Sequence, residues 1–225
     1  PGQHRAIVWT DVRGGVREPD NDNTRTASSS AVGVDLPSLT LGQAQPLTLL
    51  PGQSRYFKLD VPAGRDLRFT LDNWTTLRDE EFEVFVAYDR VPSPGDFDEA
   101  FFAESALGAP EVLVPTSQAG TYYVLVRNPY LLAFSNDRAD VSLTAEAFTF
   151  SLFSTTPEAG GNQGRVVATI RGAQLTEGTA FRLERGGTRI DGALVRLLSS
   201  MEAEVRFDLR GQPLGQYDLV AAQGG

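Results

Sequence analysis

Cysteine is absent from this 225-residue sequence, and histidine and lysine occur once each, as His4 and Lys58. Without cysteine the chain forms no disulfide, offers no thiol nucleophile and binds no zinc through thiolates. A Ser-His-Asp triad would have to use His4, which lies in a terminal segment. The sequence also lacks the HExxH, GxSxG, Walker and dinucleotide-binding glycine motifs. We therefore expect a protein without catalytic residues, not an enzyme.

The sequence is equally poor in long apolar runs and in positive charge. No stretch approaches the ~18–20 apolar residues of a membrane span, and the formal net charge is −9. An acidic surface repels phosphate backbones and anionic lipids. These features predict neither nucleic-acid binding nor membrane insertion. The first residue is Pro1 and not methionine, which we interpret as a processed chain or an excised segment.

Short runs in which apolar and polar residues alternate fill most of the sequence. Residues 57–61 (FKLDV), 67–71 (LRFTL), 141–145 (VSLTA) and 205–209 (VRFDL) all show this pattern. A period of two is typical of half-buried β-strands, and turns containing glycine or proline separate the runs. The segment 98–107 is compatible with one helical turn at most. The sequence therefore predicts an all-β fold of antiparallel sandwiches.

Three regions are expected along the chain. Residues 1–40 hold an apolar strand, a polar patch and a connector, and residues 41–146 form a first sandwich domain. Residues 147–225 form a second domain in tandem with the first, and no flexible linker separates the two near Phe148.

The first sandwich resembles the bacterial pre-peptidase C-terminal domain family. The resemblance rests on residues 50–57 (LPGQSRYF), 66–71 (DLRFTL), 82–86 (FEVFV) and 119–126 (AGTYYVLV). Domains of this family are jelly-roll-like sandwiches appended to secreted peptidases and large surface proteins. The resemblance therefore implies a jelly-roll-like first domain in an extracellular protein.

The second sandwich resembles an IPT/TIG-type immunoglobulin-like module. Residues 153–161 (FSTTPEAGG) are similar to that family's first strand and turn, 167–175 (VATIRGAQL) to its second strand, and 205–209 and 214–220 to later strands. The resemblance implies an Ig-like domain. The family normally has one more strand after this point, where the given sequence ends.

Residues 6–34 resemble the end of a third kind of adhesion module, the CARDB type. Such modules close with a strand, an acidic and Asn-rich patch such as 18–23 (EPDNDN), and a final strand such as 31–34 (AVGV). The resemblance implies the remnant of an Ig-like module at the N-terminal end.

Glu18, Asp20 and Asp22 are the candidate metal ligands, because oxygen ligands at alternating positions suit Ca²⁺. The patch departs from the EF-hand pattern, since Arg25 stands at the required glycine and Ala31 at the closing glutamate. A polar turn is the favoured interpretation, with structural calcium as the alternative; no other cofactor is expected. A second acidic group, at Asp96, Asp98, Glu99 and Glu104, is interpreted as a solvated loop.

Trp74, Tyr88 and Tyr130 are the candidate ligand-binding residues, because sugar rings stack on exposed aromatic faces. All three lie in or beside expected loops, as do Phe97, Phe101 and Phe102. The favoured interpretation is that these rings cap the ends of a sandwich.

The apolar residues Ala6, Ile7, Val8 and Trp9 form a candidate assembly strand. An apolar strand without its own sandwich must pair with something, since exposed edges and apolar faces are costly. Either the strand is the cut end of an upstream domain, or it adds to the incomplete sandwich of a neighbouring subunit. Head-to-tail addition of that kind does not close and would build a filament.

Taken together, the favoured function is that of a non-catalytic extracellular module, structural and adhesive, at the bacterial cell surface or secreted. It would serve as a spacer or repeating subunit of an adhesin or filament, with neighbouring domains or identical subunits as partners. The alternative is an accessory module that binds polysaccharide or protein for a secreted hydrolase.

Overall fold

The computed structural model describes residues 2–5, 7–9, 25–73, 82–102, 110–129 and 139–224. Every regular element in these residues is a β-strand, and all strand ladders are antiparallel, so the predicted all-β sandwich fold is confirmed. The chain divides into two compact units, residues 1–37 and residues 38–225. In the part of the chain that the structure describes, no helix is long and apolar enough to span a bilayer.

The N-terminal unit contains four short strands that pair two by two, with β1 on β4 and β2 on β3. These strands are β1 Gly2–His4, β2 Ile7–Trp9, β3 Arg25–Ala27 and β4 Val32–Val34. Ile7 lies opposite Ala27, and its side chain is 53% exposed. The apolar strand at 7–9 is therefore not alone, since β3 of the same chain pairs with it, but this two-stranded ladder has no core beneath its described side chains.

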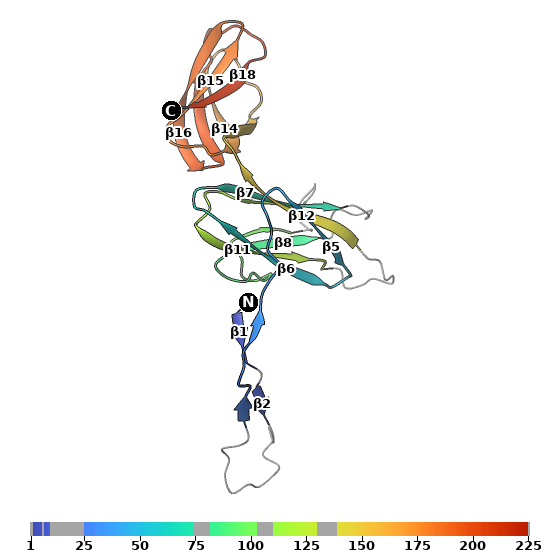
Figure 1. Cartoon of the computed structure of the whole chain (residues 1–225). Helices are drawn as coiled ribbons and strands as arrows, with labels where there is room; N and C mark the ends of the chain where they lie inside the picture. Colours follow the sequence, from blue (N-terminus) through green and yellow to red (C-terminus); the bar gives the residue numbers. More distant parts are fainter. Residues whose placement is uncertain are drawn as a thin grey trace. The chain divides into compact units, whose positions relative to one another are not determined.

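The first sandwich of the larger unit consists of two four-stranded sheets, in the orders β10-β7-β12-β5 and β6-β11-β8-β9. The first sheet contains β5 Ala44–Leu49, β7 Asp66–Asn73, β10 Glu111–Val114 and β12 Ala139–Phe148. The second contains β6 Ser54–Val61, β8 Glu83–Tyr88, β9 Glu99–Phe101 and β11 Gly120–Arg127. Figure 1 labels β5, β7 and β12 of the first sheet and β6, β8 and β11 of the second.

The core between these sheets follows directly from the alternation in the sequence. In β6, Phe57, Leu59 and Val61 are buried, whereas Lys58 is partly exposed and Asp60 is exposed. Successive side chains of a strand point to opposite faces, so one face of each strand supplies the core. Gly64, in the turn between β6 and β7, has a φ of +79°, a conformation that a residue with a Cβ rarely adopts.

The segment 98–107 is not helical where the structure describes it. Glu99–Phe101 is strand β9, which pairs with β8 and places Phe101 opposite Val84. The expectation of a helical turn is wrong for these residues, because pairing with a buried strand outweighs local preference. Residues 103–109 lie outside the described part of the chain.

The second sandwich is a six-stranded arrangement in the order β13-β14-β17-β16-β15-β18. Its strands are β13 Ser151–Thr156, β14 Arg165–Ala173, β15 Thr179–Arg185, β16 Thr188–Ser199, β17 Glu202–Asp208 and β18 Asp218–Gln223. The long strand β16 pairs with β15 through its first residues and with β17 through its later ones. One strand therefore belongs to both halves of the sheet, and a separate apolar core forms around Ile170, Phe181 and Val205.

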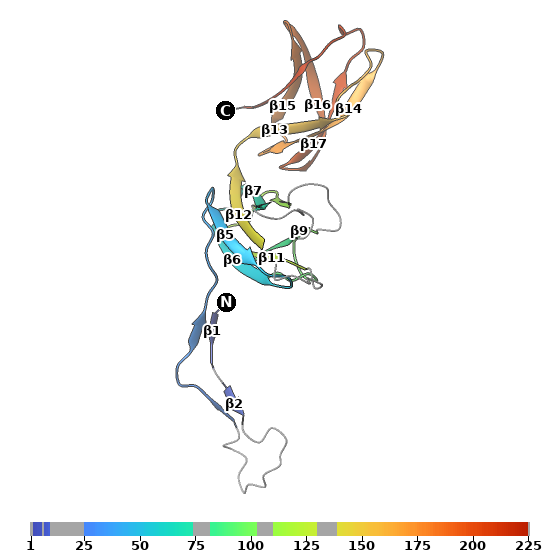
Figure 2. The same cartoon turned by 90° about the vertical axis from the view of Figure 1, so that its right-hand side faces the viewer.

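Only Thr149 and Phe150 separate the end of β12 from the start of β13. Figure 2 shows the chain passing from β12 into β13. A connection this short contains no flexible linker between the last strand of the first sandwich and the first strand of the second.

Candidate functional site

The joint between the two sandwiches is built around Asp66, the first residue of β7. Asp66 has no exposed surface, and it is the one buried charged side chain among the residues that the structure describes. A buried carboxylate is costly unless hydrogen bonds satisfy its oxygens. The partners of Asp66 therefore decide whether this residue stabilises or weakens the fold.

Asp66 accepts hydrogen bonds from both sandwiches. In the first, the backbone N–H of Thr116 donates to Oδ1 at 2.8 Å. In the second, the backbone N–H of Gln174 donates to Oδ2 at 2.6 Å, and the Ser200 hydroxyl donates to Oδ1. Hydrogen bonds to an ionised acceptor are roughly twice as strong as neutral ones. One side chain thus connects residues that are far apart in the sequence and belong to different sandwiches.

The two backbone donors to Asp66 share an uncommon conformation. Thr116 has a φ of +49° and Gln174 a φ of +56°, which places both non-glycine residues in the left-handed region. Such residues cost roughly 1–3 kcal/mol each and persist where the surroundings hold them. At both positions the N–H bound to Asp66 is one of the interactions that hold the backbone in this conformation.

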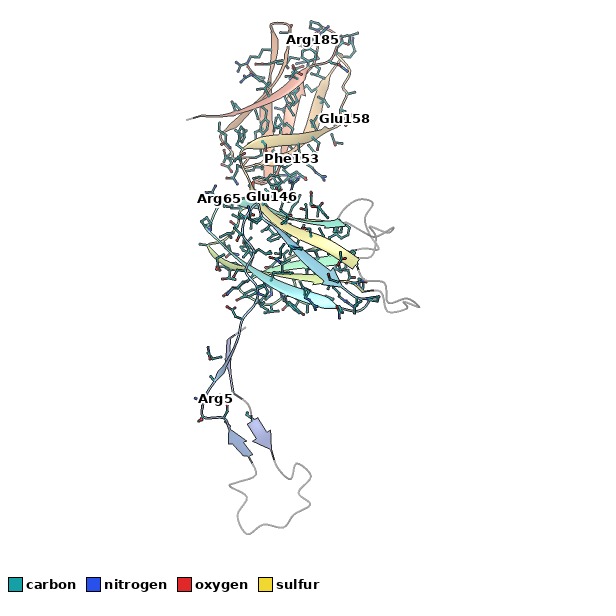
Figure 3. The ribbon with its side chains drawn as sticks, turned by 45° about the vertical axis from the view of Figure 1, so that its right-hand side comes forward. Arg5, Arg65, Glu146, Phe153, Glu158 and Arg185 are labelled. Carbon is teal, nitrogen blue, oxygen red and sulfur yellow. The ribbon has the colours of Figure 1, made fainter. Side chains whose placement is uncertain are left out.

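Side chains around the β12–β13 connection add a second set of contacts. The Arg68 guanidinium donates to Glu146 Oε2, at 2.5 Å from Nη2, and its Cζ lies 4.8 Å from the centre of the Phe148 ring. The Phe148 ring in turn lies 4.9 Å from the ring of Phe153 in β13. Figure 3 shows Glu146 and Phe153 on either side of this connection.

Close backbone packing also contributes at this end of the second sandwich. A Cβ added at Gly172 in β14 would overlap the carbonyl oxygen of Ser151 in β13. The Gly172 N–H donates to the carbonyl of Met201 at 3.0 Å. Glycine at this position allows the close approach of β13 to β14 next to the joint.

The predicted metal ligands Glu18, Asp20 and Asp22 lie outside the described residues, and so does Glu104. Of the second acidic group, Asp96 and Asp98 are paired with Arg90, at 2.9 Å to its Nε and 2.6 Å to its Nη2 respectively. Among the described residues, no group of three or more acidic, histidine or cysteine side chains is placed to hold a metal ion.

Arg90 determines the electrostatics of this loop. Burial is the largest single influence on the pKa of Asp98 and raises it, but the hydrogen bonds from Arg90 and from the Tyr88 N–H outweigh burial and lower the pKa below its usual value. The pKa of Glu99 is raised, by burial first and by the nearby charge of Asp98 second. The loop is therefore held by an internal ion pair.

Tyr88 is the predicted ligand-binding residue that lies within the described chain. Its ring centre is 5.3 Å from that of Tyr122, and its hydroxyl donates to the carbonyl of Ala119 at 2.8 Å. Tyr88 is partly buried and packs against the first core, which favours the interpretation that it caps the sandwich. Trp74 and Tyr130 lie outside the described residues.

Three phenylalanine side chains form a cluster that was not predicted from the sequence: Phe85, Phe97 and Phe102. Phe85 of β8 is fully buried, and its ring centre lies 5.4 Å from that of Phe97 and 5.2 Å from that of Phe102. Ala87 and Leu125, also buried, lie outside the core cluster between the sheets. The segment that contains Phe97 and Phe102 thus packs on buried Phe85 apart from the main core.

The predicted assembly residues Ile7, Val8 and Trp9 form strand β2, and Ala6 lies outside the described residues. The side chain of Ile7 is exposed. None of the described side chains of residues 1–37 is buried.

The second sandwich contains an open groove of about 590 Å³ along one side. Its walls come from the two end strands of the sheet and the segments next to them, including Thr155, Pro157, Tyr217 and Leu219. Its other apolar lining residues are the buried Ala168, Ile190 and Phe207 and the partly exposed Val166, Leu183 and Leu209. The sequence indicated no groove here, because the wall residues are distant from one another along the chain.

No family model matches this chain, and no curated protein sequence does. Among the solved structures that share a likeness with this chain are two that match about half of it. A periplasmic inhibitor of g-type lysozyme from Aeromonas hydrophila, PliG, is 11% identical, with a TM-score of 0.37, and the match covers 50% of this chain and 96% of the inhibitor. The pre-peptidase C-terminal domain of collagenase from Bacillus anthracis is 9% identical, with a TM-score of 0.37, and the match covers 51% of this chain and 98% of the domain.

Likeness at this level assigns no function to the chain. The family named in the second match is the one that residues 50–57 and 119–126 resemble. The resemblances of the second sandwich to IPT/TIG modules and of residues 6–34 to CARDB modules stay predictions.

Proposed function

We propose that this chain is a non-catalytic structural module of an extracellular bacterial protein, in which Asp66 joins two β-sandwiches into one mechanical unit. The observation that carries the proposal is the set of three hydrogen bonds from Thr116, Gln174 and Ser200 to one buried carboxylate. A module that transmits force or keeps a spacing needs a joint that resists bending, and hydrogen bonds to a buried ion are directional.

Several further features support a structural role at a cell surface or in a secreted protein. The chain is acidic, which favours solubility outside the cell. The β12–β13 connection is two residues long, and Arg68, Phe148 and Phe153 pack beside it. The resemblance of the first sandwich to pre-peptidase C-terminal domains, which accompany secreted and surface proteins, agrees with this location.

Substitution of Asp66 tests the proposal. In Asp66→Ala the buried donors lose their acceptor, at a cost of about 1–3 kcal/mol for each donor left unpaired. We expect the unfolding of the wild-type chain to be a single transition in scanning calorimetry and the variant to show two, because the sandwiches then unfold independently.

Asp72→Ala is the matched control, because Asp72 is exposed and lies on the same strand, β7. It should leave the single transition in place. A single transition at the wild-type temperature in Asp66→Ala would show that the carboxylate does not couple the sandwiches, and the proposal would then be wrong. Asp66→Asn removes the charge and keeps the size of the side chain. Because the amide keeps one acceptor oxygen, the unfolding of this variant should be intermediate between that of the wild type and that of Asp66→Ala.

A further inference from the structure

The two end strands of the second sandwich, β13 and β18, are less buried than its inner strands. β13 and β18 contain no buried residue, whereas β14, β15, β16 and β17 each contain at least one. In the first sandwich even the end strands β5, β6, β9 and β10 bury apolar side chains. The groove therefore lies beside these two end strands, with the segments 157–162 and 212–217 in its walls, while the core residues such as Ile170 and Val205 are buried.

The shape and chemistry of this groove fit an extended strand. β18 pairs with β15 and β13 pairs with β14, and the ladders of the described residues include no pairing of β13 with β18. The backbone of each end strand therefore presents one free edge for a further strand. The partly exposed apolar residues Val166, Leu183 and Leu209 line the groove, so an added strand with alternating apolar side chains would cover them.

The charge at the groove points to a basic or neutral occupant. Among the described residues that line it, the charged ones are Glu158 and Asp218. Figure 3 shows Glu158 beyond the end of β13. Residues 2–9 (GQHRAIVW) contain Arg5 and His4 and no acidic residue, and they include a run of four apolar residues. The charges are thus complementary.

The N-terminal segment also has apolar residues with nothing to cover them. β2 pairs only with β3 among the described strands, and Ile7 is 53% exposed. A two-stranded ladder without a core is at best marginally stable in water. Docking would bury this apolar surface and cover the groove of the second sandwich at the same time.

We propose that the groove between β13 and β18 accepts β2 of a second copy of this chain by β-strand addition. The added strand lies along a free edge of the second sandwich, and its apolar residues face the groove. Because the donor and acceptor surfaces differ, the contact is head-to-tail and each copy offers both surfaces. The protein would then form open chains of copies. This inference deepens the proposed structural function by naming its partner.

Paired variants test the donor and the acceptor separately. Ile7→Asp changes an exposed donor residue, and Leu219→Asp places a charge in the groove wall; thermal unfolding confirms that each variant is folded. We expect wild-type chains to associate in a concentration-dependent way in analytical ultracentrifugation up to about 0.5 mM. Each variant alone should associate at least about tenfold more weakly, because a carboxylate would have to be desolvated.

Mixing the two variants gives the most specific result. The Ile7→Asp chain keeps an intact groove and the Leu219→Asp chain keeps an intact donor strand, so the mixture should form a one-to-one dimer that does not extend. Ser30→Asp is the control for added charge alone, because Ser30 is exposed, lies between β3 and β4 and is outside residues 2–9. It should associate as the wild type does.

A synthetic peptide of residues 3–11 is the independent probe. It should bind the Ile7→Asp chain, and a peptide of the same composition in scrambled order should not. The proposal is overturned if the wild-type chain stays monomeric over the whole concentration range, or if association is unchanged by both variants. Either result would leave the Asp66 experiment unaffected, because that experiment measures the unfolding of a single chain.

Discussion

The two sandwiches of residues 38–225 are built from similar strands but close their cores differently. In the first, two sheets of four strands face each other, and each end strand contributes buried apolar residues such as Leu49, Phe57 and Val112. In the second, one sheet bends around its core through β16, and its end strands β13 and β18 bury nothing completely. The first sandwich therefore has buried end strands, whereas the end strands of the second contribute to the walls of a groove.

Truncation of one buried phenylalanine in each core is the strongest test of this difference. Phe69 of β7 is fully buried in the first core, and Phe207 of β17 is 2% exposed but lines the groove. Phe69→Ala should destabilise the protein by about 3–5 kcal/mol, because it leaves a sealed cavity. Phe207→Ala should cost less, because the space it leaves opens into a groove.

Urea unfolding measured by far-ultraviolet circular dichroism gives the two free energies. Both variants replace phenylalanine with alanine, so a difference in the free energy of unfolding reflects the surroundings of the residue and not the type of side chain removed. An equal loss in both would mean that the second core is as well sealed as the first, which would contradict the open groove.

Gly172 and Gly161 provide a smaller and more local comparison within the second sandwich. Gly172→Ala places a methyl group against the carbonyl oxygen of Ser151, so β13 must move away from β14. Overpacking of this kind typically costs about 1–3 kcal/mol. Gly161→Ala meets no atom within 4 Å and should be close to neutral. The melting temperatures of both variants are measured by thermal unfolding. Equal melting temperatures would show that β13 moves away from β14 without loss of stability.

The strands were predictable from the sequence because each carries its own signal. The alternation in 57–61, 67–71 and 205–209 places Phe57, Phe69 and Phe207 in the core, as observed. The three-residue strand β9 is too short to show a period, and its pairing with β8 decides its conformation. Similarly, residues 25–27 (RTA) carry no strand pattern, but they pair with β2.

The joint was not predictable because its parts are far apart in the chain. The donors to Asp66 lie 50, 108 and 134 residues away, at Thr116, Gln174 and Ser200. In the sequence, Asp66 reads as a polar residue at the start of a strand, one of 29 acidic residues. Only the packing of the two sandwiches shows that it is buried. The groove escaped prediction for the same reason, since β13 and β18 are more than sixty residues apart.

The smallest expected effect is on the stability at low pH, and it concerns one carboxylate from each sandwich. Asp98 accepts from Arg90 and from the Tyr88 N–H at 2.7 Å. Asp208 accepts from Arg210 and Arg165, and its pKa is lowered chiefly by the hydrogen bonds from Arg210. A carboxylate whose pKa is lower in the folded state stabilises the fold above its ordinary pKa of 3.8 and loses that contribution as the pH falls through the folded value.

Asp98→Asn and Asp208→Asn should therefore each lower the melting temperature slightly at pH 7. The difference in melting temperature between each variant and the wild type should become smaller below about pH 3.8, the ordinary carboxyl pKa. The two should respond differently to salt. Asp208 is bound mainly by exposed arginine side chains, and its backbone donor, the Arg210 N–H, is at 3.3 Å, so 1 M salt, where the screening length is about 3 Å, should remove most of the Asp208→Asn effect. The Asp98→Asn effect should persist in part, because Asp98 has the shorter backbone hydrogen bond, 2.7 Å from the Tyr88 N–H, and such a bond is not an ion pair. Equal salt sensitivity would mean that Asp98 acts through Arg90 alone and that the Tyr88 N–H does not contribute to holding the loop.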